Sequence, residues 1–170
     1  MRREGIRELT YVSLSVAIMA VLSQIAIPIG AVPITIQAFV VALIGYFLGA
    51  KKGFAAVTVY ILLGLVGVPV FASLQGGFQV LIGYTGGFVF GYLPFVLLCG
   101  IGSGRVASIA LGIVGLLACH IAGTVQYMLL SGISLWGALI VASLPYLVKD
   151  IALVVAAYFV SETMKKRLKK

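Results

Sequence analysis

The chain has 170 residues, of which 62% are hydrophobic and only 9% are charged. A soluble domain of this length must cover its surface with polar groups, so this composition excludes one and indicates an integral membrane protein. The formal net charge of +8 is compatible with nucleic-acid binding. However, eleven of the twelve basic residues lie at the termini or in short breaks between apolar segments, which is typical of membrane orientation and argues against a nucleic-acid partner.

Six apolar segments follow one another along a single domain, residues 1–170, and predict an all-α membrane protein with six transmembrane helices. The expected spans lie at approximately 10–28, 36–50, 53–64, 82–101, 106–130 and 145–162. The first follows a short charged tail and is too long for a signal peptide. On it, Ser13 and Ala17 form a small-xxx-small pair that permits close approach of another helix.

The connections between the spans alternate in charge. The N-terminal tail, Lys51-Lys52, Arg105 and the C-terminal tail are basic, whereas connections near 28–36, 64–84 and 131–144 carry no charge. Six spans put both termini on one side, and basic connections face the cytoplasm. The sequence therefore predicts cytoplasmic termini and three uncharged outer connections. In the first of these, Pro28, Gly30 and Pro33 predict an extended stretch.

The stretch from Gly64 to Gly91 has no charged residue, yet eight of its 28 positions are glycine. This much glycine disfavours a continuous helix, and the stretch is too apolar for a soluble loop. Irregular backbone survives at membrane depth only where protein buries it or where it lines a cavity. We expect it to line a ligand cavity; a glycine-rich packing loop is the alternative.

Lys149 and Asp150 stand apart from the other charges, one turn into the last span. A charge at the centre of a membrane helix costs about 2.5–3.5 kcal/mol on insertion scales. We expect the pair to meet a polar ligand near the outer surface. The alternative is an interfacial pair, with Lys149 snorkelling and Asp150 near the positive helix end.

Other polar and aromatic residues are candidates for lining the same cavity, and Gln126 and Tyr127 are expected at the depth of Asp150. The polar candidates are Thr35, Gln37, Gln126 and Tyr127, and the aromatic wall candidates are Phe71, Phe78, Tyr84, Phe88 and Tyr92. His120 is most simply interpreted as an interhelical hydrogen-bonding residue. It provides neither a metal site nor a nucleophile with Asp150. The sequence also lacks the GxxxxGK[ST] phosphate loop, so ATP-driven transport requires partner subunits.

Three segments carry a resemblance to a known family. They are VPITIQAF at Val32–Phe39, the glycine-rich stretch GVPVFA…GG…TGG within Gly64–Gly91, and Pro145-Tyr146…Asp150. With its length and six expected spans, the chain resembles the BioY family, the biotin-specific substrate-binding subunits (S components) of energy-coupling factor (ECF) transporters. There are two departures. Tyr84 stands where the family has proline before TGG, and Leu153 stands where it commonly has lysine.

The resemblance implies high-affinity capture of biotin from outside and its uptake across a prokaryotic cytoplasmic membrane. It implies a pocket capped by the connections after the first and third helices, no cofactor and no catalysis. The implied partners are a membrane coupling subunit and two cytoplasmic ABC ATPases, which alone use ATP. The coupling face would be the small residues of the first helix, Ser13, Ala17 and Ala20. The sequence leaves a homo-oligomer open.

The chemistry of biotin suggests a role for each candidate residue. Asp150 would accept ureido N–H bonds, and Thr35, Gln37 or Gln126 would bind the ureido carbonyl. Lys149, or backbone N–H groups around Thr85-Gly86-Gly87, would take the carboxylate. Three alternatives stay open: an S component for another vitamin, a small intramembrane enzyme that uses His120 with Asp150, and a structural or assembly protein whose glycine-rich stretch serves only packing.

Overall fold

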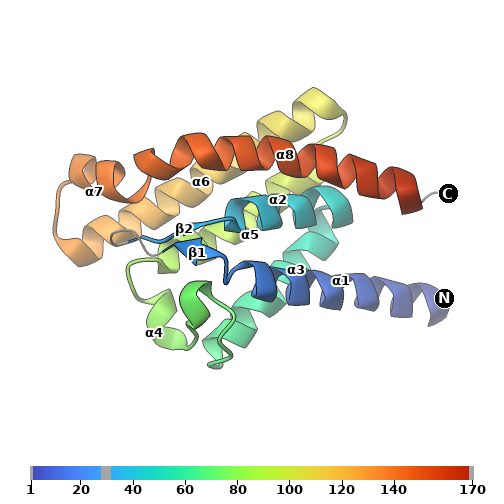
Figure 1. Ribbon diagram of the computed structural model, residues 1–170, viewed down its shortest axis with the longest axis horizontal. Coiled ribbons are helices and arrows are strands. Elements are labelled where there is room, and N and C mark those ends of the chain that lie inside the picture. The colour runs from blue at the N-terminus through green and yellow to red at the C-terminus, as the bar shows by residue number, and fades with distance from the viewer. Residues whose placement is uncertain (1, 28–31, 169–170) are drawn as a thin grey trace.

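The computed structural model describes residues 2–27 and 32–168, which form helices joined by short irregular segments (Figure 1). The α-helices are α1 (Arg2–Leu22), α2 (Gln37–Leu48), α3 (Ala50–Leu65), α4 (Phe78–Leu81), α5 (Gly86–Ile101), α6 (Arg105–Ser131), α7 (Leu135–Ala142) and α8 (Leu144–Leu168). A short 3-10 turn covers Ala72–Leu74. The predicted all-helical class is confirmed.

The first uncharged connection contains a short antiparallel pair of strands. β1 (Ala26–Ile27) pairs with β2 (Ile34–Thr35), with Ala26 opposite Thr35. The extended stretch expected around Pro33 is thus confirmed at both ends. The expected helix stop at Pro28 and Gly30 lies outside the described residues, and α1 already ends at Leu22.

The helix boundaries differ from the expected spans at two further places. α1 begins at Arg2, so the charged tail continues the helix instead of preceding it. The break between α2 and α3 lies at Gly49, whose φ of +78° suits glycine, and Lys51 and Lys52 belong to the first turn of α3. Lys52 pairs with Glu8 of α1 at 2.7 Å, which ties these two helix ends together.

The other two uncharged connections contain short helices that the sequence did not reveal. α7 lies in the connection after α6, and its start is capped by Ser134, whose Oγ accepts a bond from the Gly137 N–H at 3.2 Å. The glycine-rich stretch leaves α3 at Leu65, passes through the 3-10 turn and the single turn of α4, and enters α5 at Gly86. Its backbone is therefore irregular, as expected.

The faces of α6 show the reverse of a soluble helix. Its inward face is built mainly from small or polar residues, Ser108, Gly112, Gly115, Cys119, His120, Gly123 and Thr124, together with the larger Leu116 and Tyr127. Its outward face is apolar, with exposed Val106, Val114, Leu117, Ile121, Val125 and Leu129. Small interhelical residues allow close packing in lipid, and polar groups turn inward there.

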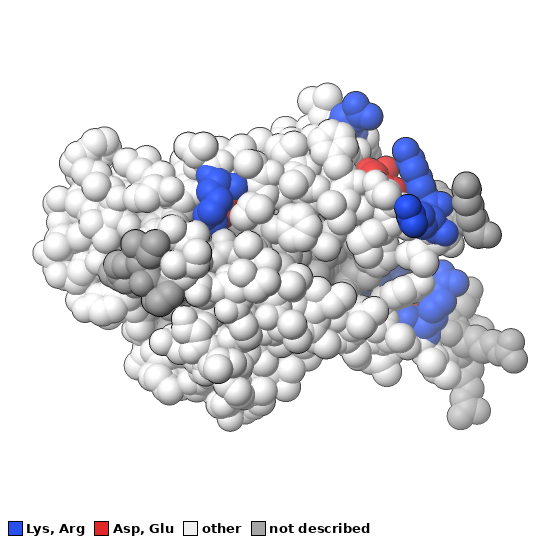
Figure 2. Space-filling view, in the orientation of Figure 1, with Lys and Arg blue, Asp and Glu red and all other residues white. Residues whose placement is uncertain are grey.

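Length and composition also identify membrane-crossing helices. Among the described residues, α1, α6 and α8 are long and apolar enough to cross a bilayer, and α2 and α5 are shorter apolar helices. Both termini lie at the same end of the molecule (Figure 1). The space-filling view shows most of the charged side chains gathered at that end, with a largely uncharged surface elsewhere (Figure 2). The chain is a membrane protein.

Helix α5 lies at the centre and packs closely against α6. Close approach depends on glycine: a Cβ on Gly87 would lie 2.3 Å from the Ala122 carbonyl oxygen, and one on Gly91 would lie 2.7 Å from the Cys119 Cα. Because no side chain separates the helices there, the N-terminal end of α5 is held beside the middle of α6. This contact fixes one wall of the cavity described next.

Candidate functional site

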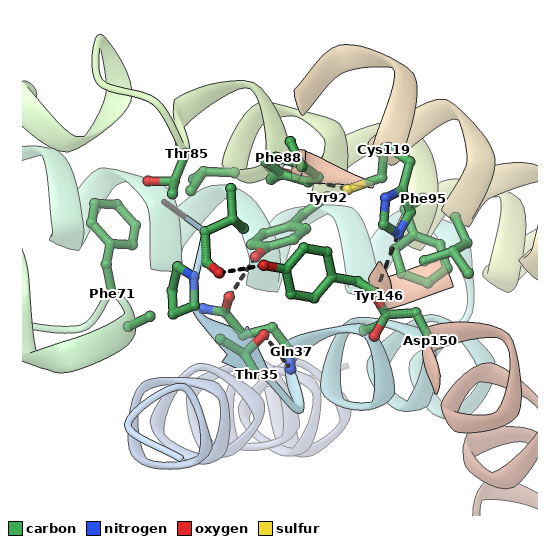
Figure 3. A pocket seen from close by; sticks show the side chains of 18 of the residues that line it. Thr35, Gln37, Phe71, Thr85, Phe88, Tyr92, Phe95, Cys119, Tyr146 and Asp150 are labelled. Atoms are coloured by element: carbon green, nitrogen blue, oxygen red, sulfur yellow. Dashed lines mark hydrogen bonds and ion pairs between the residues drawn. The ribbon is translucent and has the colours of Figure 1, made fainter. Parts of the chain in front are cut away.

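A cavity of about 270 Å³ lies between the starts of α2, α5 and α8, the middle of α6 and the glycine-rich stretch. It is lined by Val32, Pro33, Thr35, Gln37, Ala38, Phe71, Ala72, Ser73, Gln75, Val80, Thr85, Phe88, Val89, Tyr92, Phe95, Leu116, Cys119, His120, Ala142, Tyr146, Lys149 and Asp150. Figure 3 shows Phe71 and Thr85 on one side of the cavity and Asp150 on the other. Such a mainly apolar cavity with a few converging polar groups is typical of a small-molecule site.

One end of the cavity is charged. Asp150 is 8% exposed, and its Oδ2 lies 3.3 Å from His120 Nε2, while its Oδ1 pairs with the Lys149 ammonium. Lys149 Nζ also donates to the Thr35 carbonyl at 2.7 Å. A carboxylate has about four lone-pair positions, so these two partners leave Asp150 able to accept further N–H bonds from a ligand.

Asp150 is held through a chain of polar side chains that begins on α6. His120 Nδ1 lies 3.0 Å from the Ser143 Oγ, which in turn lies 2.6 Å from Thr124 Oγ1. The expected interhelical role of His120 is confirmed, since its two ring nitrogens contact Ser143 before α8 and Asp150 within it. Ser143 and His120 therefore orient the Asp150 carboxylate. Because Ser143 does not line the cavity, its hydroxyl is not presented to a ligand.

The α2 wall carries a buried amide. Gln37 Oε1 accepts from the Tyr92 hydroxyl at 2.6 Å, and Gln37 Nε2 donates to the Tyr60 hydroxyl at 3.3 Å. The Tyr60 hydroxyl in turn donates a hydrogen bond to the Val70 carbonyl at 2.9 Å. Since an amide nitrogen has two hydrogens, Gln37 retains one that a ligand carbonyl can accept.

Aromatic rings form the apolar surfaces between these polar groups. Phe71, Phe88, Phe95 and Tyr146 come from three different parts of the chain. The Tyr146 hydroxyl also donates to the Val32 carbonyl at 2.7 Å, which fastens the chain before β2 to the start of α8 (Figure 3).

Seven of the residues singled out from the sequence come together around the cavity: Thr35, Gln37, Phe71, Thr85, His120, Lys149 and Asp150. Phe88 and Tyr92 lie there too, as the aromatic pattern predicts. Phe78 does not; it is 60% exposed on α4.

Five other residues singled out from the sequence lie outside the lining and make hydrogen bonds or packing contacts behind it. Gln126 Nε2 donates to the carbonyls of Leu81 and Gly83, at 2.8 and 2.7 Å. Gly86 and Gly87 are packing positions, because a Cβ on either would meet a backbone carbonyl oxygen at 1.8 and 2.3 Å. Tyr84 and Tyr127 pack on each other with ring centroids 5.4 Å apart.

Several contributors were not singled out from the sequence. Tyr60 supports the amide wall from α3, and Phe95, Ser73 and Gln75 line the cavity. Tyr146 entered only as part of the Pro-aromatic pattern. The sequence signal for Tyr60 is a tyrosine inside an apolar span, since a hydroxyl buried there must find a hydrogen-bond partner.

Comparison with known proteins places this geometry in a family. The model described as "BioY family" matches residues 1–170. The chain belongs to the BioY family. It is 35% identical over 159 residues to a "Probable biotin transporter BioY" of Pyrococcus horikoshii, covering 94% of this chain and 96% of that protein.

A second relative and a solved structure are also similar to this chain. The chain is 48% identical over 87 residues to a "Biotin transporter BioY" of Thermotoga maritima, covering 51% of this chain and 52% of that protein. The crystal structure of "the S-component for biotin from an ECF-type ABC transporter" has a TM-score of 0.90, with 24% identity over 98% of this chain and 94% of that one. At this identity, the structural similarity establishes the fold.

Proposed function

We propose that this BioY-family chain captures biotin at the outer face of a prokaryotic cytoplasmic membrane, as the substrate-binding subunit of an ECF-type transporter. The observation that carries the proposal is the cavity, in which a carboxylate and an amide project from a mainly apolar wall that contains several aromatic rings. Biotin needs these groups: its ureido ring donates and accepts hydrogen bonds, and its thiophane ring and valeryl chain are apolar. The names of the relatives support the choice of vitamin.

Asp150 is the proposed partner of the ureido N–H groups, and Gln37 or Thr35 that of the ureido carbonyl. The biotin carboxylate would then lie toward Thr85, on the far side of the cavity from Asp150 (Figure 3). The alternative, with Lys149 binding the carboxylate, brings two negative groups together, because Lys149 is already paired with Asp150.

The proposed topology has six crossings, by α1, α2, α3, α5, α6 and α8, with both termini in the cytoplasm. α2 has 12 residues and α3 and α5 have 16 each. At 1.5 Å per residue, such helices rise about 18–24 Å, less than the hydrocarbon core of about 30 Å. Irregular segments buried among the longer helices would complete these crossings.

An enzyme that uses His120 and Asp150 is not supported. The relatives are named as transporters, and Ser143, the hydroxyl next to His120, lies outside the cavity lining. The energy for release would come from partners, namely a coupling subunit in the membrane and two ABC ATPases. No cofactor is proposed for the chain itself.

The exposed face of α1 that carries Ser13, Ala17 and Ala20 is the proposed contact with the coupling subunit. Ser13 and Ala17 are exposed and Ala20 is partly exposed, so small residues form a strip on which another helix can pack. Ala17→Trp should block that approach. We expect uptake of labelled biotin to fall at least tenfold in cells that express the chain with an ECF module, with equilibrium biotin binding unchanged.

The matched control is Ile18→Trp, since Ile18 is exposed on the same helix but points about 100° away. It should keep both uptake and binding. Uptake by Ala17→Trp at the wild-type rate would place the coupling face elsewhere. Absence of biotin uptake by the wild-type chain with its module would contradict the proposed function.

A further inference from the structure

The cavity wall formed by residues 66–77 contains a strained turn. Phe71 N donates to the Gln75 carbonyl at 2.9 Å, which closes the turn. At its tip Ser73 and Leu74 have φ values of +59° and +58°, a region that residues other than glycine rarely adopt. Leu74 is 69% exposed, so burial of its side chain does not hold it. Strained backbone of this kind persists only where its surroundings impose it.

The side chain of Gln24, just beyond α1, imposes it. Its Oε1 accepts a bond from the Leu74 N–H at 2.8 Å. Its Nε2 lies 3.3 Å from the Val70 carbonyl and 2.9 Å from that of Ala20, the last turn of α1. The neighbouring Ser23 hydroxyl donates to the same Val70 carbonyl. One amide therefore joins both arms of the turn to the end of α1.

Phe71 lies between these two attachment points and is the residue that they position. It is 2% exposed, lines the cavity and packs edge-on against Tyr60, with ring centroids 5.6 Å apart. Gly64 makes room for it, since a Cβ there would lie 2.1 Å from the ring. The Tyr60 hydroxyl also donates to the Val70 carbonyl, so the attachment continues to the Gln37 wall.

We propose that Gln24 and Ser23 form a latch that positions residues 70–74 and keeps Phe71 in the cavity wall, so that the bound ligand is retained. Neither residue lines the cavity, and both act through the turn. The proposal rests on the proposed function where retention is measured with biotin. The latch itself is testable without any ligand.

The experiment combines amide hydrogen exchange at Leu74, without ligand, with dissociation of labelled biotin from purified protein. Gln24→Ala should speed Leu74 exchange and biotin dissociation, each about tenfold, as expected for loss of one to two hydrogen bonds. Gln24→Glu keeps the acceptor for the Leu74 N–H but loses the donor to the Val70 carbonyl, so Leu74 exchange should be slower than in Gln24→Ala and faster than in the wild type. Gln79→Ala is the matched control, because Gln79 bonds locally to the Gly76 carbonyl; both rates should equal the wild type.

Unchanged Leu74 exchange in Gln24→Ala would overturn the latch whatever happens to biotin. Faster exchange with unchanged biotin dissociation would overturn its role in retention. If the wild type does not bind biotin, the proposed function fails, while Leu74 exchange still decides on the latch. Should Gln24→Ala not fold, Ser23→Ala removes a donor to Val70 and should speed Leu74 exchange in the same direction; the wild-type rate there would contradict the proposal.

Discussion

Replacing Asp150 by asparagine should weaken biotin binding about a hundredfold or more, measured by titration calorimetry on purified protein. Asparagine keeps the shape of the side chain and removes its charge. Hydrogen bonds to a charged group contribute about 1.5–3 kcal/mol each, and every 1.4 kcal/mol corresponds to a tenfold change. The variant also leaves Lys149 without its carboxylate partner, which adds to the loss.

Glu162→Gln is the control for this substitution. Glu162 lies on the same helix but pairs with Lys165 at 3.1 Å, near the termini and outside the cavity lining. It should bind biotin as the wild type does. Thermal unfolding of both variants separates loss of binding from loss of fold. If folded Asp150→Asn bound biotin with wild-type affinity, Asp150 would have no role in recognition.

Replacing Gly87 by alanine should lower the stability of the chain by about 2 kcal/mol, or roughly 4–8 °C in Tm. The added Cβ would lie 2.3 Å from the Ala122 carbonyl oxygen and 2.8 Å from its carbonyl carbon. Backbone atoms cannot rotate away, so α5 and α6 must separate. Because this contact holds the cavity wall at Thr85, biotin binding should weaken as well.

Gly5→Ala makes the same change on α1, where a Cβ would meet no atom within 4 Å. It should leave the Tm unchanged or raise it slightly, since alanine favours helix more than glycine does. The measurement is thermal unfolding in detergent for both variants. Equal Tm values for Gly87→Ala and the wild type would mean that this interface yields more easily than its geometry indicates.

Much of the fold could be predicted because the patterns behind it are local. Runs of apolar residues located the long helices, and glycine and proline located the irregular uncharged connections. The bounds of α6, Arg105–Ser131, nearly match the expected 106–130. The end of α1 could not be predicted, because Ser23 and Gln24 bond to residues far along the chain.

The candidate site could be predicted where unusual chemistry marked it. A charge in an apolar chain is costly, so Lys149 and Asp150 stood out, and both line the cavity. Gln126 was expected in the cavity because of its depth along the span, but it does not line the cavity. It lies six residues after His120, which turns it about 240° around the helix and directs it to the Leu81 carbonyl. Rotation about a helix axis becomes known only once the neighbouring helices are placed.

The hydrogen-bonded chain Tyr92–Gln37–Tyr60 shows a second limit of prediction from the sequence. Its three members come from α5, α2 and α3, and nothing in their spacing pairs them. Gln37 was expected from its place at the start of a span. Its hydroxyl partners follow only from the packing of the three helices.

Equilibrium binding of biotin to the purified chain, with thiamine and riboflavin as competitors, tests the biotin site most directly. We expect tight binding of one biotin per chain, unaffected by excess of either competitor. Tight binding of thiamine or riboflavin instead would keep the fold and contradict the assigned vitamin. Binding of none of the three by folded protein would contradict the claim that the cavity between Asp150 and Thr85 is a biotin site.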